Sequence, residues 1–349
     1  MNRQLTKVLS TFIPGKEHRR AFRRRHANFS PSITVSNVGK VYLPLYHQGA
    51  HYDEKEPEIF NRFGEPVRTL FVRDFHSSFR CALAGRYLYW DKYNFGLKNH
   101  LYTHRAMLET IGAPDHRFGA LMETPGITPE DYRIFDENPG LEKDFDLVFT
   151  YDLRLLDRMT NARFVPFCAG IKLDFSDIEG SLALMRDDLH QEKSLNVSIL
   201  SSAKVSAPLH RLRKEFAEYA KRNACCDTYG NFDGGTFVRA FDTLADYRFS
   251  VVIENTLEEC TFTEKLTNCF ACQTIPIYIG PRGVSRFLNM DGIIHVKDLS
   301  MRGIVDALKC CTEQEYKDRL GPVMDNYRRV QEYRNIDDMM FLQHLKGLI

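Results

Sequence analysis

The chain has 349 residues, which is enough for two domains of ordinary size. Apolar residues make up 43% and charged residues 27% of the sequence, as in soluble globular proteins, and a net charge of +1 excludes an overall bias toward nucleic acid or membrane. No apolar run approaches the roughly 18–20 residues of a membrane-spanning helix. The short apolar stretch at residues 8–13 is not followed by the cleavage site of a secretory signal.

The cysteines predict free thiols. There are nine, an odd number, and they are scattered along the chain. The adjacent pairs Cys225–Cys226 and Cys310–Cys311 have poor geometry for disulfides. Cys269 and Cys272 form a CxxC inside an apolar helical pattern, without the second pair that a zinc site needs. This usage is typical of a reducing compartment, so we expect a cytoplasmic protein.

The first half of the chain predicts a basic arm followed by an α/β unit. The arm covers residues 1–30, a strand-like alternation follows at 31–46, and amphipathic spacing predicts helix over 76–109. Apolar or β-branched runs bounded by turn residues predict further strands at 67–73, 118–122, 147–151 and 163–167.

A polar segment, residues 170–193, connects this unit to a second one. Further strands are predicted at 195–200, 226–232, 248–255, 274–280 and 293–296. Helices are predicted at 208–222 and 261–273 and after a capping box formed by Thr312 and Glu315. Because strands and helices alternate on both sides of the linker, we expect two α/β domains with parallel sheets, 31–180 and 181–320. A helical tail, 321–349, should pack back toward the first domain.

The stretch 247–280 has the pattern of a phosphate site. A buried strand ends at Ile253 and is followed by Glu254 and Asn255, at the sheet edge where open α/β sheets bind ligands. A short loop leads to a helix that opens with three polar residues, Thr263, Glu264 and Lys265. The N–H groups and dipole of a helix N-terminus suit a pyrophosphate. An ordinary βαβ unit with Thr263 as N-cap would show the same pattern.

The amino-acid sequence of this stretch resembles glycosyltransferase family 10, the α-1,3/α-1,4-fucosyltransferases. The resemblance lies in EN, a loop, TEK, a helix and then IPIYIG, in this order. Looser similarity extends over about residues 180–297, including ILSS at 199–202 and CDTYGNF at 226–232. The resemblance implies a GT-B fold, in which two Rossmann-like domains face each other across a cleft. The domain 31–180 would bind the acceptor and the domain 181–320 the GDP-sugar. It also implies inverting transfer of L-fucose, or a related sugar, from GDP-fucose to a glycan hydroxyl, without a cofactor or metal.

The resemblance also assigns donor-binding residues by position. Lys265 should contact the β-phosphate, and Glu264 a hydroxyl of the ribose or the donor sugar. Glu254, Asn255 and Thr263 should line the same pocket.

An arginine on the helix 208–222 joins that lysine in the family. Arg213 fits this place best, and Arg211 is the alternative. One position departs from the family pattern, because Thr261 stands where an aromatic residue is common. This departure leaves the donor sugar open beyond its GDP group.

Glu123 is the candidate catalytic base. It follows the predicted strand 118–122 directly and precedes a Pro–Gly turn, so its carboxylate should lie at a strand's carboxyl end. The family has Glu-x-Pro at the corresponding place, which implies that this glutamate takes the proton of the acceptor hydroxyl. Such a base is worth about 10²–10⁴ in rate. Alternatively, Glu123 only caps the turn; Glu130 and Asp131, at the next helix start, read as ordinary capping acids.

Weaker signals concern the acceptor and metals. His100 and His104 lie four apart on the predicted helix, near an aromatic cluster around Trp90, and these three are weak candidates for acceptor binding. The two histidines lack a third ligand and the glutamate of HExxH, so we expect no zinc. Asp144 and Asp146 form a DFD that we interpret as structural, and no metal is expected.

The basic arm suggests where the reaction takes place. Residues 1–28 carry eight Lys or Arg residues against one acid. This pattern is typical of peripheral contact with an anionic membrane, here at the inner face, rather than with nucleic acid, and the alternative is a terminus that is only solvated. The acceptor would then be a glycan or glycolipid of surface polysaccharide or lipopolysaccharide synthesis. The alternative is a catalytically weak nucleotide-sugar-binding protein on the same fold, suggested by Thr261 and by a divergent first domain, which shows almost no resemblance to the better-known members before residue 115.

Overall fold

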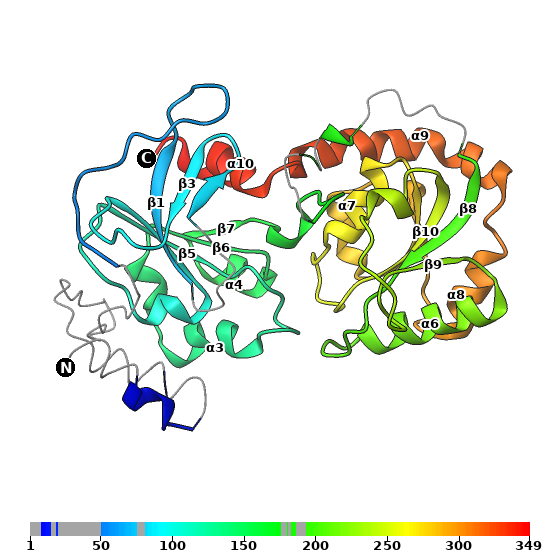
Figure 1. The fold of residues 1–349 in the computed structure, drawn as a ribbon, viewed down its shortest axis with the longest axis horizontal. Coiled ribbons are helices and arrows are strands. Elements are labelled where there is room, and N and C mark those ends of the chain that lie inside the picture. Colours follow the sequence, from blue (N-terminus) through cyan, green and yellow to red (C-terminus); the bar gives the residue numbers. More distant parts are fainter. Residues whose placement is uncertain are drawn as a thin grey trace.

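The computed structural model describes residues 8–14, 19, 50–74, 81–175, 180, 183–185 and 193–349. They form two α/β domains, each built on one sheet, that lie side by side and are connected by the linker and by the C-terminal helices (Figure 1). The strand predicted at 31–46 and most of the basic arm lie outside the described residues. Among the helices of the described ranges, none combines the length and apolar character that crossing a bilayer requires.

The first domain is built on a seven-stranded sheet. Its strands, in spatial order, are β2 (Ala82–Ala84), β3 (Leu88–Asp91), β1 (Arg68–Arg73), β4 (Asn99–Thr103), β5 (His116–Ala120), β6 (Leu147–Thr150) and β7 (Ala162–Phe164). All neighbours are parallel except β2, which is antiparallel to β3. Strands β1, β5, β6 and β7 confirm the predicted runs. Strands β4 and β6 are buried along their whole length, as expected of a parallel sheet covered on both faces.

The helix predicted over residues 76–109 is wrong. In its described part the segment forms β2, β3, β4 and a 3-10 helix, His104–Leu108. Side chains along β3 alternate between buried and half-buried, which is the period of a strand. Asp91 then turns the chain, since its carboxylate accepts hydrogen bonds from the backbone N–H groups of Tyr93 (2.6 Å) and Asn94 (2.9 Å). Such Asp turns compete with helix, and the aromatic spacing that suggested a helix comes from short strands and turns.

The second domain is built on a five-stranded parallel sheet. Its strands, in spatial order, are β12 (Ile294–His295), β11 (Ile275–Ile279), β10 (Tyr247–Ile253), β8 (Leu195–Leu200) and β9 (Asp227–Tyr229). Its helices are α6 (His210–Asn223), α7 (Glu264–Ala271), α8 (Met301–Leu308) and α9 (Glu313–Arg329). The predicted strands and helices of this unit are confirmed. The capping start of α9 is confirmed as well, because the Thr312 hydroxyl accepts the N–H of Glu315 (3.1 Å).

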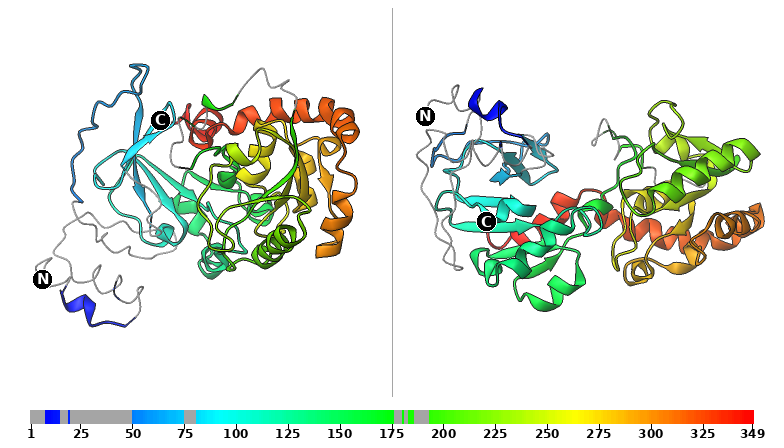
Figure 2. Two further views of the ribbon diagram at one scale, coloured as in Figure 1. Left: turned by 45° about the vertical axis from the view of Figure 1, so that its right-hand side comes forward. Right: turned by 90° about the horizontal axis from the view of Figure 1, so that it is seen from below.

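The C-terminal segment returns to the first domain. Helix α9 runs along the second domain, and α10 (Ile336–Met340) with a π-helical turn, Phe341–Leu345, then lies next to the first domain in all three views (Figures 1 and 2). The rings of Tyr87 and Phe341 stack at 5.0 Å, and Asp338 accepts the backbone N–H of Arg86 (2.7 Å). The expected return of the tail is therefore confirmed. A domain boundary at residue 321, however, would cut through α9.

The two domains share a hydrophobic core. One cluster of buried side chains extends from Phe118 and Phe149 in the first domain through Ile199 in the second to Leu345 in the tail. A separate cluster packs on the first domain and includes residues of helix α3 (Pro129–Glu137) and helix α4 (Leu153–Arg158). Because the larger cluster is continuous, separating the domains would expose apolar surface to water. Each Å² exposed would cost about 25 cal/mol, so the shared core holds the domains together.

Candidate functional site

Glu254 lies at the carboxyl end of β10 and holds the start of α7. Its side chain is fully buried, and both of its oxygens bind Thr263, which donates its N–H to Oε1 (3.0 Å) and its hydroxyl to Oε2 (2.7 Å). Burial raises the pKa of Glu254. Thr263 is also buried and serves as the N-cap of α7. Neither side chain lines the cavity described below; both position the loop and the start of α7, and a direct contact with the donor stays a prediction.

Helix α6 brings Arg213 to the same strand end. Arg213 is buried, and its guanidinium donates to the carbonyl oxygen of Ile253 (3.0 Å) and to Oδ1 of Asn255 (3.1 Å). The Nε2 of His210 bonds to the same Oδ1 (2.9 Å), and burial lowers the pKa of His210, which favours its neutral form. Arg211 is exposed on α6. Of the two arginines that the sequence proposed, the structure places Arg213 at the strand end.

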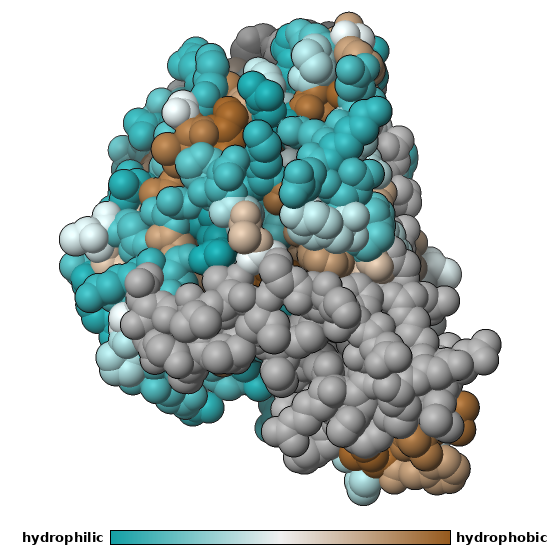
Figure 3. Space-filling view, turned by 90° about the vertical axis from the view of Figure 1, so that its left-hand side faces the viewer, coloured by the Kyte–Doolittle hydropathy of each residue, from teal (hydrophilic) through white to brown (hydrophobic). Residues whose placement is uncertain are grey.

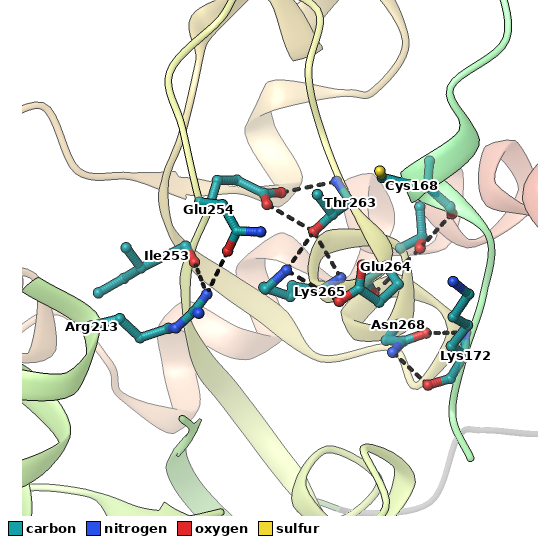
Figure 4. Close-up of polar contacts among 12 residues, drawn as sticks. Cys168, Lys172, Arg213, Ile253, Glu254, Thr263, Glu264, Lys265 and Asn268 are labelled. Carbon is teal, nitrogen blue, oxygen red and sulfur yellow. Dashed lines mark hydrogen bonds and ion pairs between the residues drawn. The ribbon is translucent and has the colours of Figure 1, made fainter. Parts of the chain in front are cut away.

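Lys265 and Glu264 occupy the first turn of α7 (Figure 4). The Nζ of Lys265 donates to Oγ1 of Thr263 (3.0 Å) and to Oε1 of Glu264 (3.1 Å), and the Lys265 side chain is 26% exposed. Burial alone would raise the pKa of Glu264, but the charges of Lys265 and Lys172 outweigh it and lower this pKa. The carboxylate is therefore ionised at neutral pH. The cations Lys265 and Lys172 and the positive end of the α7 dipole meet at this helix start, and such a combination binds phosphate.

A cavity of about 650 Å³ adjoins these residues, and both domains line it. Its lining includes the candidate residues Glu123 from the first domain and Arg213, Asn255, Glu264 and Lys265 from the second. This volume lies within the range of sites that enclose nucleotide-sized ligands. Two parallel-sheet α/β domains thus face a common cavity, which is the expected GT-B arrangement.

Glu123 follows β5 at the carboxyl end of the first sheet, and its side chain is exposed. The Tyr132 hydroxyl donates to the backbone carbonyl of Glu123 (2.5 Å) and so fixes the turn from α3. Gly126, in the same turn, lies against the loop that follows β10. A Cβ atom at this glycine would lie 2.4 Å from a carboxylate oxygen of Glu258 and 2.5 Å from Cγ2 of Thr256. The turn that carries Glu123 is therefore set directly against the donor-side domain.

The two other acids near Glu123 lie on α3, as expected. Asp131 is fully buried, and its carboxylate lies 3.0 Å from Nδ1 of His104 and 3.0 Å from Nε of Arg105. Glu130 lies 3.8 Å from the Arg105 guanidinium. Neither acid lines the cavity. Asp131 is paired with Arg105 and contacts His104, which leaves Glu123 as the acid of this segment that lines the cavity.

His100, His104 and Trp90 do not line the cavity either. His100 is fully buried in β4, where its Nδ1 bonds to the Tyr102 hydroxyl (2.8 Å) and burial lowers its pKa to about 3. His104 and Trp90 are each 4% exposed. Acceptor binding by these three residues stays a prediction that this cavity does not support. The prediction assumed a helix with one exposed face, whereas β3, β4 and the 3-10 helix after β4 turn these side chains into the core.

The residues of the DFD sequence have structural partners. Asp144 ends a 3-10 helix, Leu141–Asp144, and the Asp146 carboxylate accepts the backbone N–H of Arg117 (2.8 Å). Within the described ranges, no group of three or more His, Cys, Asp or Glu side chains is arranged to hold a metal ion. The nine cysteines are all free thiols.

Sequence reasoning missed several residues of the site. Ser201 and Ser202 line the cavity directly after β8, and the strand-end rule that identified Asn255 would have found them. Gly230 directly follows β9 with φ +100°, and a Cβ there would lie 2.1 Å from the carbonyl oxygen of Ser201. The backbone of Lys172 forms hydrogen bonds with the side chain of Asn268 on α7. These residues are far apart in the chain, so no local sequence pattern predicts the contact.

The second domain matches the model of a known protein family. The model of glycosyltransferase family 10 (fucosyltransferase), C-terminal part, matches residues 190–319. A fucosyltransferase-like protein of Arabidopsis thaliana is 33% identical over 84 residues, which is 23% of this chain; the match spans about a sixth (16%) of that relative's length. A crystal structure of α1,3-fucosyltransferase with GDP is 16% identical, with a TM-score of 0.47, over 85% of this chain and 95% of the other. One with GDP-fucose is also 16% identical, with a TM-score of 0.44, over 81% and 94%.

Proposed function

Because its C-terminal domain belongs to glycosyltransferase family 10, we propose that this chain is an inverting fucosyltransferase that moves L-fucose from GDP-fucose to a glycan hydroxyl. One observation carries the proposal: a single cavity is lined by the cations of one domain and by the carboxylate of Glu123 from the other. The donor phosphate needs cations to stabilise its negative charge, and the acceptor hydroxyl needs a carboxylate to take its proton. Transfer requires both in one site.

The donor binds to the second domain in this proposal. Lys265 and Arg213 hold the diphosphate, helped by the dipole of α7. Asn255, which Arg213 and His210 orient through its Oδ1, lines the same wall. Glu264 is ionised and accepts a hydrogen bond from a hydroxyl of the ribose or the donor sugar.

The reaction is a single displacement. The acceptor oxygen attacks C1 of fucose, the bond between C1 and the phosphate oxygen breaks, and Glu123 takes the acceptor proton. GDP leaves with both electrons of the broken bond, and Lys265 and Arg213 stabilise the charge that develops on its phosphate. Because attack and departure take place on opposite faces of the sugar, the anomeric configuration inverts. The two cations do the work of a metal ion, so the reaction is metal-independent.

A donor screen by thermal melting tests the proposal. GDP and GDP-fucose should raise the melting temperature with or without EDTA, whereas UDP-glucose should not; a ligand at 100 times its Kd stabilises by about 2.7 kcal/mol. Stabilisation by UDP-glucose alone, or only with manganese, would contradict it. A nucleotide-sugar-binding protein without catalysis would bind GDP-fucose but neither transfer nor slowly hydrolyse it.

We further propose that the acceptor is a lipid-linked glycan of surface polysaccharide or lipopolysaccharide synthesis, at the cytoplasmic face of the membrane. Two features near the N-terminus support membrane contact. Residues 1–28 carry eight basic residues, each worth about 1 kcal/mol beside an anionic surface. Val8, Leu9 and Phe12 are 56%, 40% and 80% exposed, and apolar surface appears at the lower edge of this side of the molecule (Figure 3). Exposed apolar side chains next to cations are typical of interfacial membrane segments.

A further inference from the structure

Two exposed phenylalanines face each other on the lining of the cavity. Phe175 and Phe237 are 46% and 69% exposed, and both line the cavity. Their ring centroids lie 6.1 Å apart with the rings at 78°, an edge-to-face pair. Neither residue belongs to the pair of cations proposed to hold the diphosphate, Arg213 and Lys265, which we call the phosphate clamp. Neither lies in the turn that carries Glu123.

Backbone contacts hold the two rings in place from distant segments. The N–H of Phe241 donates to the carbonyl oxygen of Leu173 (3.1 Å), which joins the segment of Phe237 to the segment of Phe175. Lys172 is in turn joined to Asn268 of α7 by two hydrogen bonds, of 2.8 and 2.9 Å. The pair is therefore positioned relative to α7, the helix that carries Lys265.

The segment that leads to Phe175 begins next to α7, where Lys172 bonds to Asn268. Figure 4 shows Arg213 and Lys172 on opposite sides, with Lys265 and Glu264 between them. Phe175 follows Lys172 by three residues. Because both rings line the same cavity as Arg213 and Lys265, a ligand whose diphosphate lies at these two cations shares the cavity with the rings.

Three polar side chains of the cavity lining are already hydrogen-bonded within the protein. Asn268 uses both its oxygen and its nitrogen on the backbone of Lys172. The hydroxyl of Thr243 donates to the carbonyl of Ala240 (2.9 Å), and that of Ser250 donates to the carbonyl of Ser198 (3.3 Å). Val238 and Ala240, which follow Phe237 closely in the chain, also line the cavity, so this wall is apolar and aromatic and suits a flat ring system better than a sugar with several hydroxyls.

We propose that Phe237 and Phe175 bind the nucleobase of the donor: the base stacks on the exposed face of one ring, and the other ring forms the side wall. The inference rests on the proposed nucleotide-sugar function and adds two positioning residues to it. Stacking at one end of the nucleotide sets the distance at which its diphosphate meets Lys265. Because every base has a π-face, this contact contributes affinity more than selectivity among bases.

Calorimetric titration of GDP and of inorganic pyrophosphate into the full chain tests the inference. Phe237→Ala and Phe175→Ala should each weaken GDP binding, by about 5- to 150-fold for the ring that carries the base, and leave pyrophosphate binding unchanged. Phe237→Tyr should restore GDP affinity. Phe63→Ala is the matched control, since Phe63 is 60% exposed but lines a different cavity.

Unchanged GDP affinity in both alanine variants would overturn the inference, as would an equal loss for GDP and pyrophosphate, which would mean a general disturbance of the site. These outcomes differ from failure of the proposed function. In that case the unaltered chain would bind neither GDP nor GDP-fucose.

Discussion

Replacing Lys265 with alanine removes one cation from the phosphate clamp and leaves the fold almost untouched. In the free protein Nζ makes two hydrogen bonds, to Thr263 and Glu264, and the side chain is 26% exposed. Partly exposed pairs of this kind contribute at most about 1 kcal/mol to folding. A charge-assisted hydrogen bond to phosphate is worth about 1.5–3 kcal/mol, so GDP affinity should fall roughly 10- to 150-fold. Without Lys265, the negative charge of the Glu264 carboxylate also loses its partner and repels the phosphate.

Isothermal titration of GDP, with a thermal melt of each variant, measures both effects. Lys214→Ala is the matched control, because Lys214 lies on α6 one residue after Arg213 but pairs with Glu218 instead of lining the cavity. Lys265→Ala should bind GDP weakly and melt close to the unaltered chain, and Lys214→Ala should bind GDP normally. GDP affinity within twofold of the unaltered chain in Lys265→Ala would refute the clamp. So would a large fall in melting temperature, because Lys265 would then be a structural residue.

Two further predictions concern the arm and a half-buried acid. Deleting residues 1–28 should reduce sedimentation with anionic vesicles and make the remaining binding less salt-sensitive, while turnover of a soluble acceptor survives; equal binding by both forms would contradict a membrane role. Asp337 hydrogen-bonds with Trp90, and burial raises its pKa to about 6 from 3.8. The folded state therefore binds more protons between these values, and stability is lost as the pH rises through this window. Asp337→Asn should melt higher than the unaltered chain at pH 7 but not below pH 4, and an equal difference at both pH values would contradict this assignment.

The strands and helices of the second domain could be predicted because local patterns determine them. Buried β-branched runs gave β8, β10 and β11, and caps at Thr263 and Thr312 marked the starts of α7 and α9. The segment 76–109 could not be predicted in this way. Its short strands are separated by turns that depend on side-chain contacts such as those of Asp91, and its aromatic spacing also fits a helix.

The site was predictable where it lies at strand ends and a helix start. Asn255, Glu264, Lys265 and Glu123 all reach one cavity, and the sequence had placed each at such an end. Burial was not predictable, because it depends on contacts between distant segments. The oxygens of Glu254 bind Thr263 instead of facing a ligand.

Thr261 illustrates the same limit. It is 3% exposed and does not line the cavity, while the neighbouring Phe262 packs against Phe287 (5.4 Å between ring centroids) and Tyr333 (5.5 Å). The family's aromatic position is thus turned into the interior here. A sequence comparison shows that the residue differs, but only the packing shows where its side chain lies.

The central claim, that Glu123 is the base of a transfer from GDP-fucose, is tested most directly by the rate of transfer in Glu123→Gln. The amide is nearly isosteric, so the turn held by Tyr132 should survive, but it cannot take up a proton at neutral pH. Glu130→Gln is the control, because Glu130 does not line the cavity. We expect Glu123→Gln to keep its melting temperature and GDP affinity and to lose about 100-fold or more in kcat, while Glu130→Gln transfers normally. A transfer rate in Glu123→Gln close to that of the unaltered chain would contradict the account.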